Sequence, residues 1–255
     1  MRACCGTLIL PSLPGSAEEL KDHVEDIDQA CDLSKVGGLP PLLSTIRGSP
    51  HARLRALAAD IVATCCQNNP KAQQQFLDAG ALDAVLLLAR DDADPTARLK
   101  GLFATSALIR QNPAGQKAFR LGDGFGMLKR AMCDDMEPKI QRRAFILAKH
   151  LATSHDMHLD TMAQLGYIRA GASALASRSS DVREASLGML LDIARHVNFE
   201  RFPTAVDDFR HPMLVAGLGA IRTTLAKQTD EGERDASADE RELADQLAAM
   251  LGTGK

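Results

Sequence analysis

Four short segments of this chain recur at an almost constant spacing, and this spacing constrains the fold more than any other feature. In each segment a glycine follows an apolar residue or Ala. The glycines lie 43, 42 and 44 residues apart, at Gly37, Gly80, Gly122 and Gly166. A fixed period of this length is typical of proteins built from stacked structural repeats.

A second marker repeats in phase with the glycines. Asn69-Pro70 recurs after 43 residues as Asn112-Pro113, and the polar segment 153–156 occupies the next equivalent position. Asn caps helices and Pro is tolerated in their first turn, so the pair predicts the start of a short helix. The following glycine predicts its end, because glycine tolerates a positive φ.

Between the markers, apolar residues recur at three- and four-residue spacing, which predicts helices. Each unit contains an apolar segment of about ten residues, a charged break, a longer helix and a short helix. Three helices in about 42 residues are typical of armadillo and HEAT repeats. We therefore expect an all-α, armadillo-like superhelical solenoid of about four three-helix repeats. A compact helical bundle would have no reason to keep this period.

The segments outside the repeats predict how the array ends. We expect a disordered leader over 1–16, an acidic N-terminal capping helix over 17–35, repeats over 36–200, and C-terminal capping helices with a polar linker over 201–255. The two C-terminal helices are expected over 212–227 and 238–251, with the linker over 228–237.

Composition limits both the core and the environment. The chain has no Trp, one Tyr and eight Phe, so its core must consist mainly of small and aliphatic residues, which suits closely packed helices. No run of 18 apolar residues predicts a membrane-spanning helix, and the N-terminus resembles a signal peptide poorly. The six cysteines follow neither a disulfide pattern nor a zinc pattern. A reducing, cytoplasmic location without membrane contact is expected.

Charge is distributed unevenly along the chain. The net charge is −3. Residues 18–35 carry −5, the residues from 225 onward carry −4 and Arg2 carries +1, so residues 36–224 carry +5. This mildly basic body between acidic ends favours an acidic protein partner and argues against nucleic acid.

Three local motifs suggest chemistry but fit structural roles better. His155 and His158 lack the His-Glu-x-x-His frame of a zinc site, so a solvated helix start is expected there and no metal. The glycine-rich segment 122–126 lacks the Lys-Ser or Lys-Thr of a phosphate loop and is expected to be a turn. Adjacent helical residues point about 100° apart, so we expect one of Cys65 and Cys66 in the core and the other half-exposed. No catalytic residue and no cofactor are predicted.

Basic residues recur near the start of successive long helices, at Arg55, Arg98 and Arg142. In a stacked array they would align as a basic stripe. The stripe has two interpretations: a solvated charged face, which is favoured because exposed charges contribute little, or a docking surface for an acidic partner.

Several stretches resemble a known family. These are Glu-Asp-Ile-Asp-Gln-Ala-Cys-Asp-Leu at 25–33, Gly-Gly-Leu-Pro-Pro-Leu-Leu at 37–43, Ala-Ala-Asp-Ile-Val-Ala-Thr at 58–64 and Gln-Asn-Asn-Pro at 67–70. They are similar to the Fes-type and heat-shock-protein-binding-protein family of armadillo-repeat nucleotide exchange factors for 70-kDa heat shock proteins. The resemblance covers about residues 18 to 200.

The resemblance implies a co-chaperone that is not an enzyme. Family members bind the ATPase domain of a cytosolic 70-kDa heat shock protein and promote ADP release, so the implied partner is that domain and no nucleotide site is needed on this chain. A monomer is expected. The alternative is a generic armadillo-repeat scaffold without exchange activity. Importin-type peptide binding is excluded, because its ladder of Trp side chains cannot exist in a chain without Trp.

The long helix of an armadillo repeat lines the concave side, which predicts the partner-binding face. Positions three or four apart share one side of a helix. The candidates in the three successive repeats are Asp60, Thr64 and Gln67; Phe103, Ala107 and Arg110; and Ile146, Lys149 and His150. Phe103 and Arg110 are the best anchors, because aromatic and Arg side chains dominate interface energetics.

Overall fold

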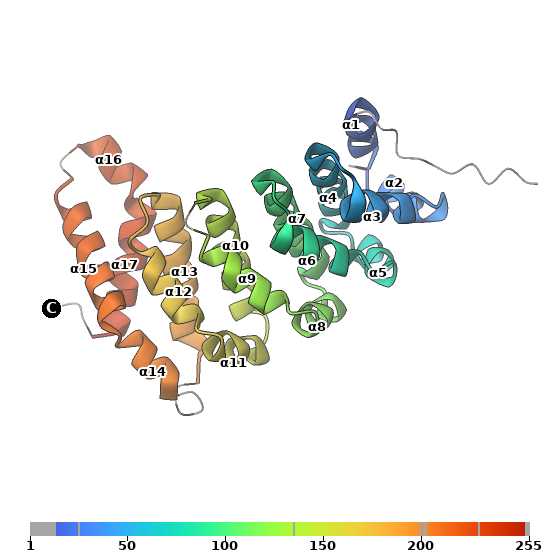
Figure 1. Ribbon diagram of the computed structural model, residues 1–255. Helices are drawn as coiled ribbons and strands as arrows, with labels where there is room; N and C mark the ends of the chain where they lie inside the picture. The colour runs from blue at the N-terminus through green and yellow to red at the C-terminus, as the bar shows by residue number, and fades with distance from the viewer. Residues whose placement is uncertain are drawn as a thin grey trace, which may run out of the picture. The chain divides into compact units, whose positions relative to one another are not determined.

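The computed structural model describes residues 14–24, 26–134, 136–198, 200, 203–228 and 230–252. These residues form α-helices and no strands (Figure 1). They belong to two compact units, Met1–Met127 and Leu128–Lys255. None of the described helices is long and apolar enough to cross a membrane.

Helices of the first unit follow the predicted order of apolar segment, long helix and short helix. In chain order they are α1 (Pro14–His23), α2 (Ile27–Lys35), α3 (Leu39–Gly48), α4 (Ala52–Cys66), α5 (Pro70–Asp78), α6 (Ala81–Asp91), α7 (Pro95–Ile109) and α8 (Pro113–Leu121). The long helices α4 and α7 pack against each other, and α6 packs against α7. The helix α9 (Gly124–Met132) begins in this unit and ends in the next.

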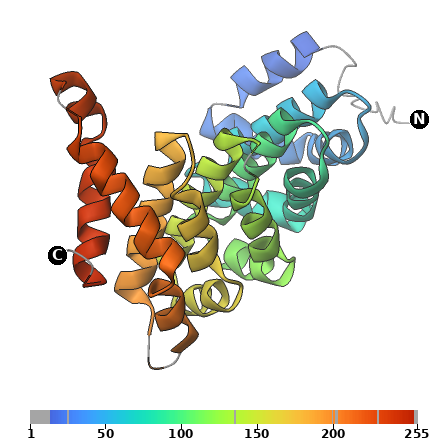
Figure 2. The same ribbon diagram turned by 60° about the vertical axis from the view of Figure 1, so that its left-hand side comes forward.

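The second unit continues the pattern and then departs from it. Its helices are α10 (Pro138–Ala152), α11 (Asp156–Gln164), α12 (Tyr167–Ala174), α13 (Ser180–His196), α14 (Pro203–Phe209), α15 (Pro212–Ala226), α16 (Glu231–Ala236) and α17 (Ala238–Met250). The long helices α10 and α13 pack together, and α17 covers α13 on the far side, beside α15 (Figures 1 and 2). The three-helix repeats and both C-terminal helices are confirmed.

The predicted N-terminal cap was wrong in detail. One helix was expected over 17–35, but the chain forms α1 and α2 with a break between them. Asp26 explains the break, because its carboxylate accepts hydrogen bonds from the backbone N–H groups of Asp28 and Gln29 and so begins a new helix. The expected leader falls mostly on residues 1–13, which lie outside the described residues.

The C-terminal linker was also wrong in part. Residues 228–237 were expected to be a polar linker, but α16 forms within them, because Asp230 accepts a hydrogen bond from the backbone N–H of Glu233. The short helix α14 was not predicted either.

The repeat glycines mostly take the conformation that their position requires. Gly37, Gly80 and Gly166 have φ values of 73°, 76° and 74°, in the left-handed region that other residues avoid. Gly122 differs, because its φ is −89° and the next residue, Asp123, takes the positive φ of 57° instead. The short helix still ends at Gly122 as predicted, but the positive φ is found one residue later.

Polar side chains cap the short helices as the second marker predicts. Asn69 accepts a hydrogen bond from Ala72 N at 3.1 Å, and Asn112 accepts one from Gly115 N at 3.1 Å. In the third position His155 takes this role, since its Nδ1 accepts from Met157 N at 3.1 Å. The repeat marker thus keeps its function although its residue type changes.

Candidate partner-binding faces

Among the α4 candidates, Asp60 lies in a small charged network rather than on an open surface. The Asp60 carboxylate is 16% exposed and pairs with Lys21 Nζ at 2.9 Å and Lys100 Nζ at 2.8 Å. Burial disfavours its ionised form, but the hydrogen bonds from the two lysines outweigh this and lower the pKa of Asp60. Thr64 is half-buried and donates its hydroxyl to the Asp60 carbonyl, and Gln67 is exposed at the end of the helix.

Of the α7 candidates, Phe103 joins the same network. Phe103 is half-buried, and Lys100 Nζ lies 5.7 Å from the centroid of its ring, a cation–π distance. Ala107 is half-buried and Arg110 is exposed, and their carbonyl oxygens both accept hydrogen bonds from Gln73 Nε2. The structure therefore joins Asp60 to Phe103 through Lys100, a residue that the sequence analysis did not select.

The α10 candidates lie in the second unit. Lys149 is exposed, while Ile146 and His150 are half-buried. A Cβ at Gly188 of α13 would come within 3.3 Å of Lys149 Nζ, so this glycine leaves room for the lysine side chain. Ile146 keeps part of its surface outside the core.

The basic stripe is not a row of free charges. Arg55 donates two hydrogen bonds to the Asp92 carboxylate, at 2.6 and 2.8 Å, and a third to the Ser49 carbonyl. Arg98 donates to the Asp92 carbonyl at 3.0 Å. The hydrogen bonds of Arg55 and Arg98 hold the turns between helices. These two guanidinium groups are half-buried, which contradicts a solvated face at their positions.

Arg142 differs from these two arginines. It is exposed and lies 3.8 Å from Asp181, a loose surface pair. Arg55 and Arg98 are the fourth residues of their helices, whereas Arg142 is the fifth residue of α10. The fourth residue of α10 is Gln141, so the stripe is out of register in the third repeat.

The remaining motifs serve the fold. Cys65 and Cys66 are both buried, at 1% and 0% exposure, so the expectation that one is half-exposed was wrong. His158 is buried, with Nδ1 3.2 Å from the Leu151 carbonyl oxygen. The segment 122–126 forms the turn into α9 and its first residues. Among the described residues, no cluster of three or more His, Cys, Asp or Glu is placed to hold a metal ion.

Comparison with known proteins decides the family. The model of the SIL1/FES1/HPBP1 C-terminal domain matches residues 29–167, more than half of the chain. The chain belongs to the SIL1/FES1/HPBP1 family. It is 33% identical to human Hsp70-binding protein 1 over 224 residues, and this aligned region covers 87% of this chain and 60% of that protein. It is 31% identical over 138 residues to the Hsp70 nucleotide exchange factor FES1 of Mycosarcoma maydis, covering 54% and 35% of the two chains.

Solved structures with this fold are armadillo repeat proteins. A designed armadillo repeat protein in complex with the peptide (KR)4 has a TM-score of 0.73 at 16% identity, over 93% of this chain and 92% of that one. The designed protein YIII(Dq)4CqI has a TM-score of 0.68 at 16% identity, over 94% and 93%. This likeness shows the armadillo fold of the family member. The chain spans about 60% of the length of the human relative.

Sequence reasoning on this SIL1/FES1/HPBP1 family member missed the role of α1. This helix packs against α4, where Lys21 reaches Asp60 and Glu18 reaches Arg53 at 2.6 Å. Opposite charges between residues 17–35 and the first long helix are visible in the sequence, but they do not identify which residues pair.

Proposed function

We propose that this chain is a cytosolic co-chaperone that binds the ATPase domain of a 70-kDa heat shock protein and promotes the release of ADP. The observation that supports this is the similarity over 87% of the chain to a protein named Hsp70-binding protein 1. Relatives named Hsp70 nucleotide exchange factor FES1 and nucleotide exchange factor SIL1 support the exchange step. We further propose that the chain acts as a monomer.

The proposed mechanism is a difference in affinity for two states of the partner. A protein that binds the open, nucleotide-poor ATPase domain more tightly than the closed ADP-bound domain shifts the population toward opening. ADP then leaves and ATP rebinds. This mechanism requires no catalytic group and no nucleotide site on the co-chaperone, so we assign neither to this chain.

We propose that the partner contacts the long helices. On α7, half-buried Phe103 offers apolar surface and exposed Arg110 offers a cation at the end of the helix. On α4, exposed Gln67 lies at the equivalent end. On α10, Lys149 is an exposed cation in the last turn of the helix. Aromatic and Arg side chains of this kind contribute most of the energy at protein interfaces.

The deciding experiment measures ADP release directly. A fluorescent ADP analogue is loaded on a 70-kDa heat shock protein, and its release is followed by stopped flow with increasing amounts of this chain. We expect the rate to rise and to saturate. A chain that binds the chaperone at saturation without changing the rate would be the generic scaffold, and the exchange function would be rejected.

A matched pair of variants tests the proposed face. Phe103→Ala combined with Arg110→Glu removes the apolar contact and reverses the charge, so we expect at least a tenfold loss of chaperone affinity, which corresponds to about 1.4 kcal/mol. Lys117→Glu reverses an exposed charge on α8 and serves as the control. Circular dichroism and the melting temperature verify that both variants fold. Equal binding by the two variants would place the interface elsewhere.

A further inference from the structure

One junction of the fold differs from the others in a way that leaves a pocket. The fourth residue of α4, α7 and α13 is an arginine: Arg55, Arg98 and Arg183. Each donates a hydrogen bond from Nη1 to a carbonyl three residues before its helix, at 2.8 to 3.0 Å. These arginines fill the turn that precedes each long helix.

Two of them also bridge to the following helices. Arg55 pairs with Asp92, which precedes α7 by three residues, and Arg183 pairs with Glu240 of α17 at 2.5 and 3.0 Å. The partner carboxylates are almost fully buried, with side chains 6% and 3% exposed. At both places an ion pair fills the space between the start of one helix and the start of the helix that packs against it.

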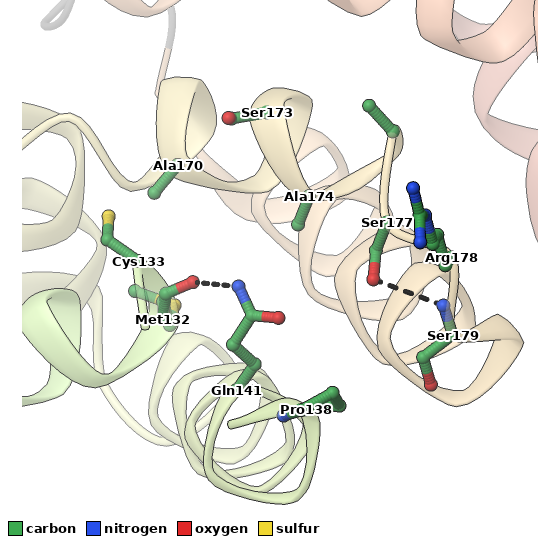
Figure 3. Close-up of a pocket in the computed structure, with 11 residues that line it drawn as sticks. Met132, Cys133, Pro138, Gln141, Ala170, Ser173, Ala174, Ser177, Arg178 and Ser179 are labelled. Carbon is green, nitrogen blue, oxygen red and sulfur yellow. Dashed lines mark hydrogen bonds between the residues drawn. The ribbon is translucent and has the colours of Figure 1, made fainter. Parts of the chain in front are cut away.

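At α10 both ends of this ion pair are replaced by shorter, uncharged side chains. Gln141 takes the place of Arg55, and Ser177, three residues before α13, takes the place of Asp92. No hydrogen bond joins them, and the space between them is a pocket of about 610 Å³ (Figure 3). This volume lies within the range of small-molecule sites, about 300–1,000 Å³.

The pocket presents one side-chain hydrogen-bond acceptor to a ligand. Gln141 is 6% exposed, and its Nε2 donates to the Met132 carbonyl at 3.0 Å, which fixes the orientation of the amide. Figure 3 shows its carbonyl oxygen, Oε1, pointing away from Met132 into the pocket. No described residue donates a hydrogen bond to Oε1. This oxygen is open to the pocket, so a ligand that carries an N–H group can donate to it in place of water.

A free thiol lies next in the chain to Met132, the residue whose carbonyl accepts the hydrogen bond from Gln141. Cys133 is exposed and lines the pocket, and it directly follows Met132, the residue that Gln141 holds. The other described cysteines, Cys31, Cys65 and Cys66, are buried. Burial raises the pKa of Cys65 to about 12 and the pKa of Cys66 well above its ordinary value, so these two thiols are unreactive.

A cation and several hydroxyl groups complete the lining. Arg178 lies at the opposite side of the pocket from Cys133 in Figure 3 and is exposed, with no carboxylate partner among the described residues. Ser173, Ser177 and Ser179 also line the pocket. The site therefore offers a thiol, an acceptor for an N–H group and a cation for a carboxylate.

We propose that this pocket is a binding and modification site for small γ-glutamyl thiol peptides of the glutathione class, which form a mixed disulfide with Cys133. Such a peptide has the three matching groups: a sulfur, amide N–H groups and terminal carboxylates. The N–H of its own cysteine is three bonds from its sulfur, so the mixed disulfide would carry this donor into the pocket that Gln141 also lines. A terminal carboxylate then lies toward Arg178.

The covalent step is a thiol–disulfide exchange. The Cys133 thiolate attacks one sulfur of oxidised glutathione, a new S–S bond forms, and the original S–S bond breaks. The released glutathione thiolate takes up the proton that Cys133 lost. The oxidant is thus the glutathione disulfide itself, and reduced glutathione reverses the step.

The test compares two disulfides on the same thiol. The full-length chain is treated with oxidised glutathione or with bis(2-hydroxyethyl) disulfide, which lacks amides and carboxylates, and peptide-resolved mass spectrometry follows the adduct at Cys133. The rate with oxidised glutathione is divided by the rate with bis(2-hydroxyethyl) disulfide. This ratio is then divided by the same ratio measured on a free peptide of residues 129–137. Pocket recognition predicts a normalised ratio of about ten, whereas a ratio of one would mean that Cys133 is only an exposed thiol and would overturn the proposal.

Variants assign the recognition to the pocket. Gln141→Leu removes the acceptor and should bring the normalised ratio close to one. Arg178→Gln should lower it about two- to threefold, because an exposed cation contributes little. Arg210→Gln, at an exposed arginine after α14, is the matched control and should leave the ratio unchanged. The rate with bis(2-hydroxyethyl) disulfide reports how accessible Cys133 is in each variant. An unchanged normalised ratio in Gln141→Leu would therefore contradict the proposal.

Discussion

The junction of α4 with α7 and the junction of α10 with α13 each join two successive long helices, but different side chains fill the two junctions. The first contains the Arg55–Asp92 ion pair, with the carboxylate side chain 6% exposed. The second contains Gln141 and Ser177 and a pocket. The comparison shows that an armadillo repeat tolerates the loss of this ion pair without losing the helix order, because the long helices still pack along their apolar faces.

The largest expected effect is at the closed junction. Arg55→Leu leaves Asp92 buried without its partner and removes the hydrogen bond to Ser49. We expect a loss of about 3 kcal/mol of unfolding free energy, as for other buried ion pairs that lose one member. Urea unfolding measures it. The equivalent change at the open junction, Gln141→Ala, removes one neutral hydrogen bond and should cost only about 1 kcal/mol. Equal costs would contradict the contrast between the junctions.

An attempt to close the open junction is the next test. Gln141→Arg combined with Ser177→Asp copies the α4–α7 ion pair into the second unit. A double-mutant cycle should give a favourable coupling of about 1–2 kcal/mol between the two positions. The double variant should also lose its preference for oxidised glutathione at Cys133, because the new side chains fill the pocket. No coupling would mean that the two positions are too far apart to meet.

A smaller effect is expected at the helix caps of the two units. Asn69 is buried, accepts the hydrogen bond from Ala72 N and contacts Cys31 Sγ at 3.6 Å. Asn69→Ala should cost about 1–2 kcal/mol. His155 caps α11 from an exposed position, so His155→Ala should cost about 0.5 kcal/mol. Thermal unfolding of both variants measures the difference, and a larger cost for His155→Ala would be inconsistent with this account.

The pH dependence of two carboxylates should give the smallest effect, with opposite signs. The hydrogen bonds from Arg55 lower the pKa of Asp92, so its stabilising contribution is present at neutral pH and is lost in acid, as the pH falls through that lowered pKa. Burial, with the charges of Asp239 and Asp181, raises the pKa of Glu184. Its ionised form therefore destabilises the fold at neutral pH, and this penalty disappears in acid.

Neutral variants separate the two contributions. Asp92→Asn should destabilise the protein at pH 7 and less at pH 3. Glu184→Gln should stabilise it slightly at pH 7 and have no effect at pH 4 and below. Urea unfolding at each pH measures both. A stabilisation by Glu184→Gln that grows as the pH falls would reverse the predicted sign.

The sequence determined the repeats, because their signals are local. Each signal acts within one or two turns of a helix: a glycine with positive φ, an Asn cap, or apolar residues spaced three or four positions apart. The period of these signals could therefore be read directly from the sequence. The three exceptions are also local. Asp26 divides the N-terminal cap, Asp230 begins α16, and Asp123 takes the conformation expected of Gly122. Each depends on a short polar side chain whose preference competes with the helical pattern.

Only the tertiary structure decided which charges are free and where a pocket exists. Arg55 and Arg142 look alike in the sequence, but Arg55 is half-buried and paired with a residue 37 positions away, whereas Arg142 is exposed. Asp60 looked like a surface candidate and instead joins α1 to α7. Such pairs form where side chains from separate helices meet. That meeting depends on helix packing and on the exact position of each residue in its helix, and a shift of one residue turns a side chain by about 100°.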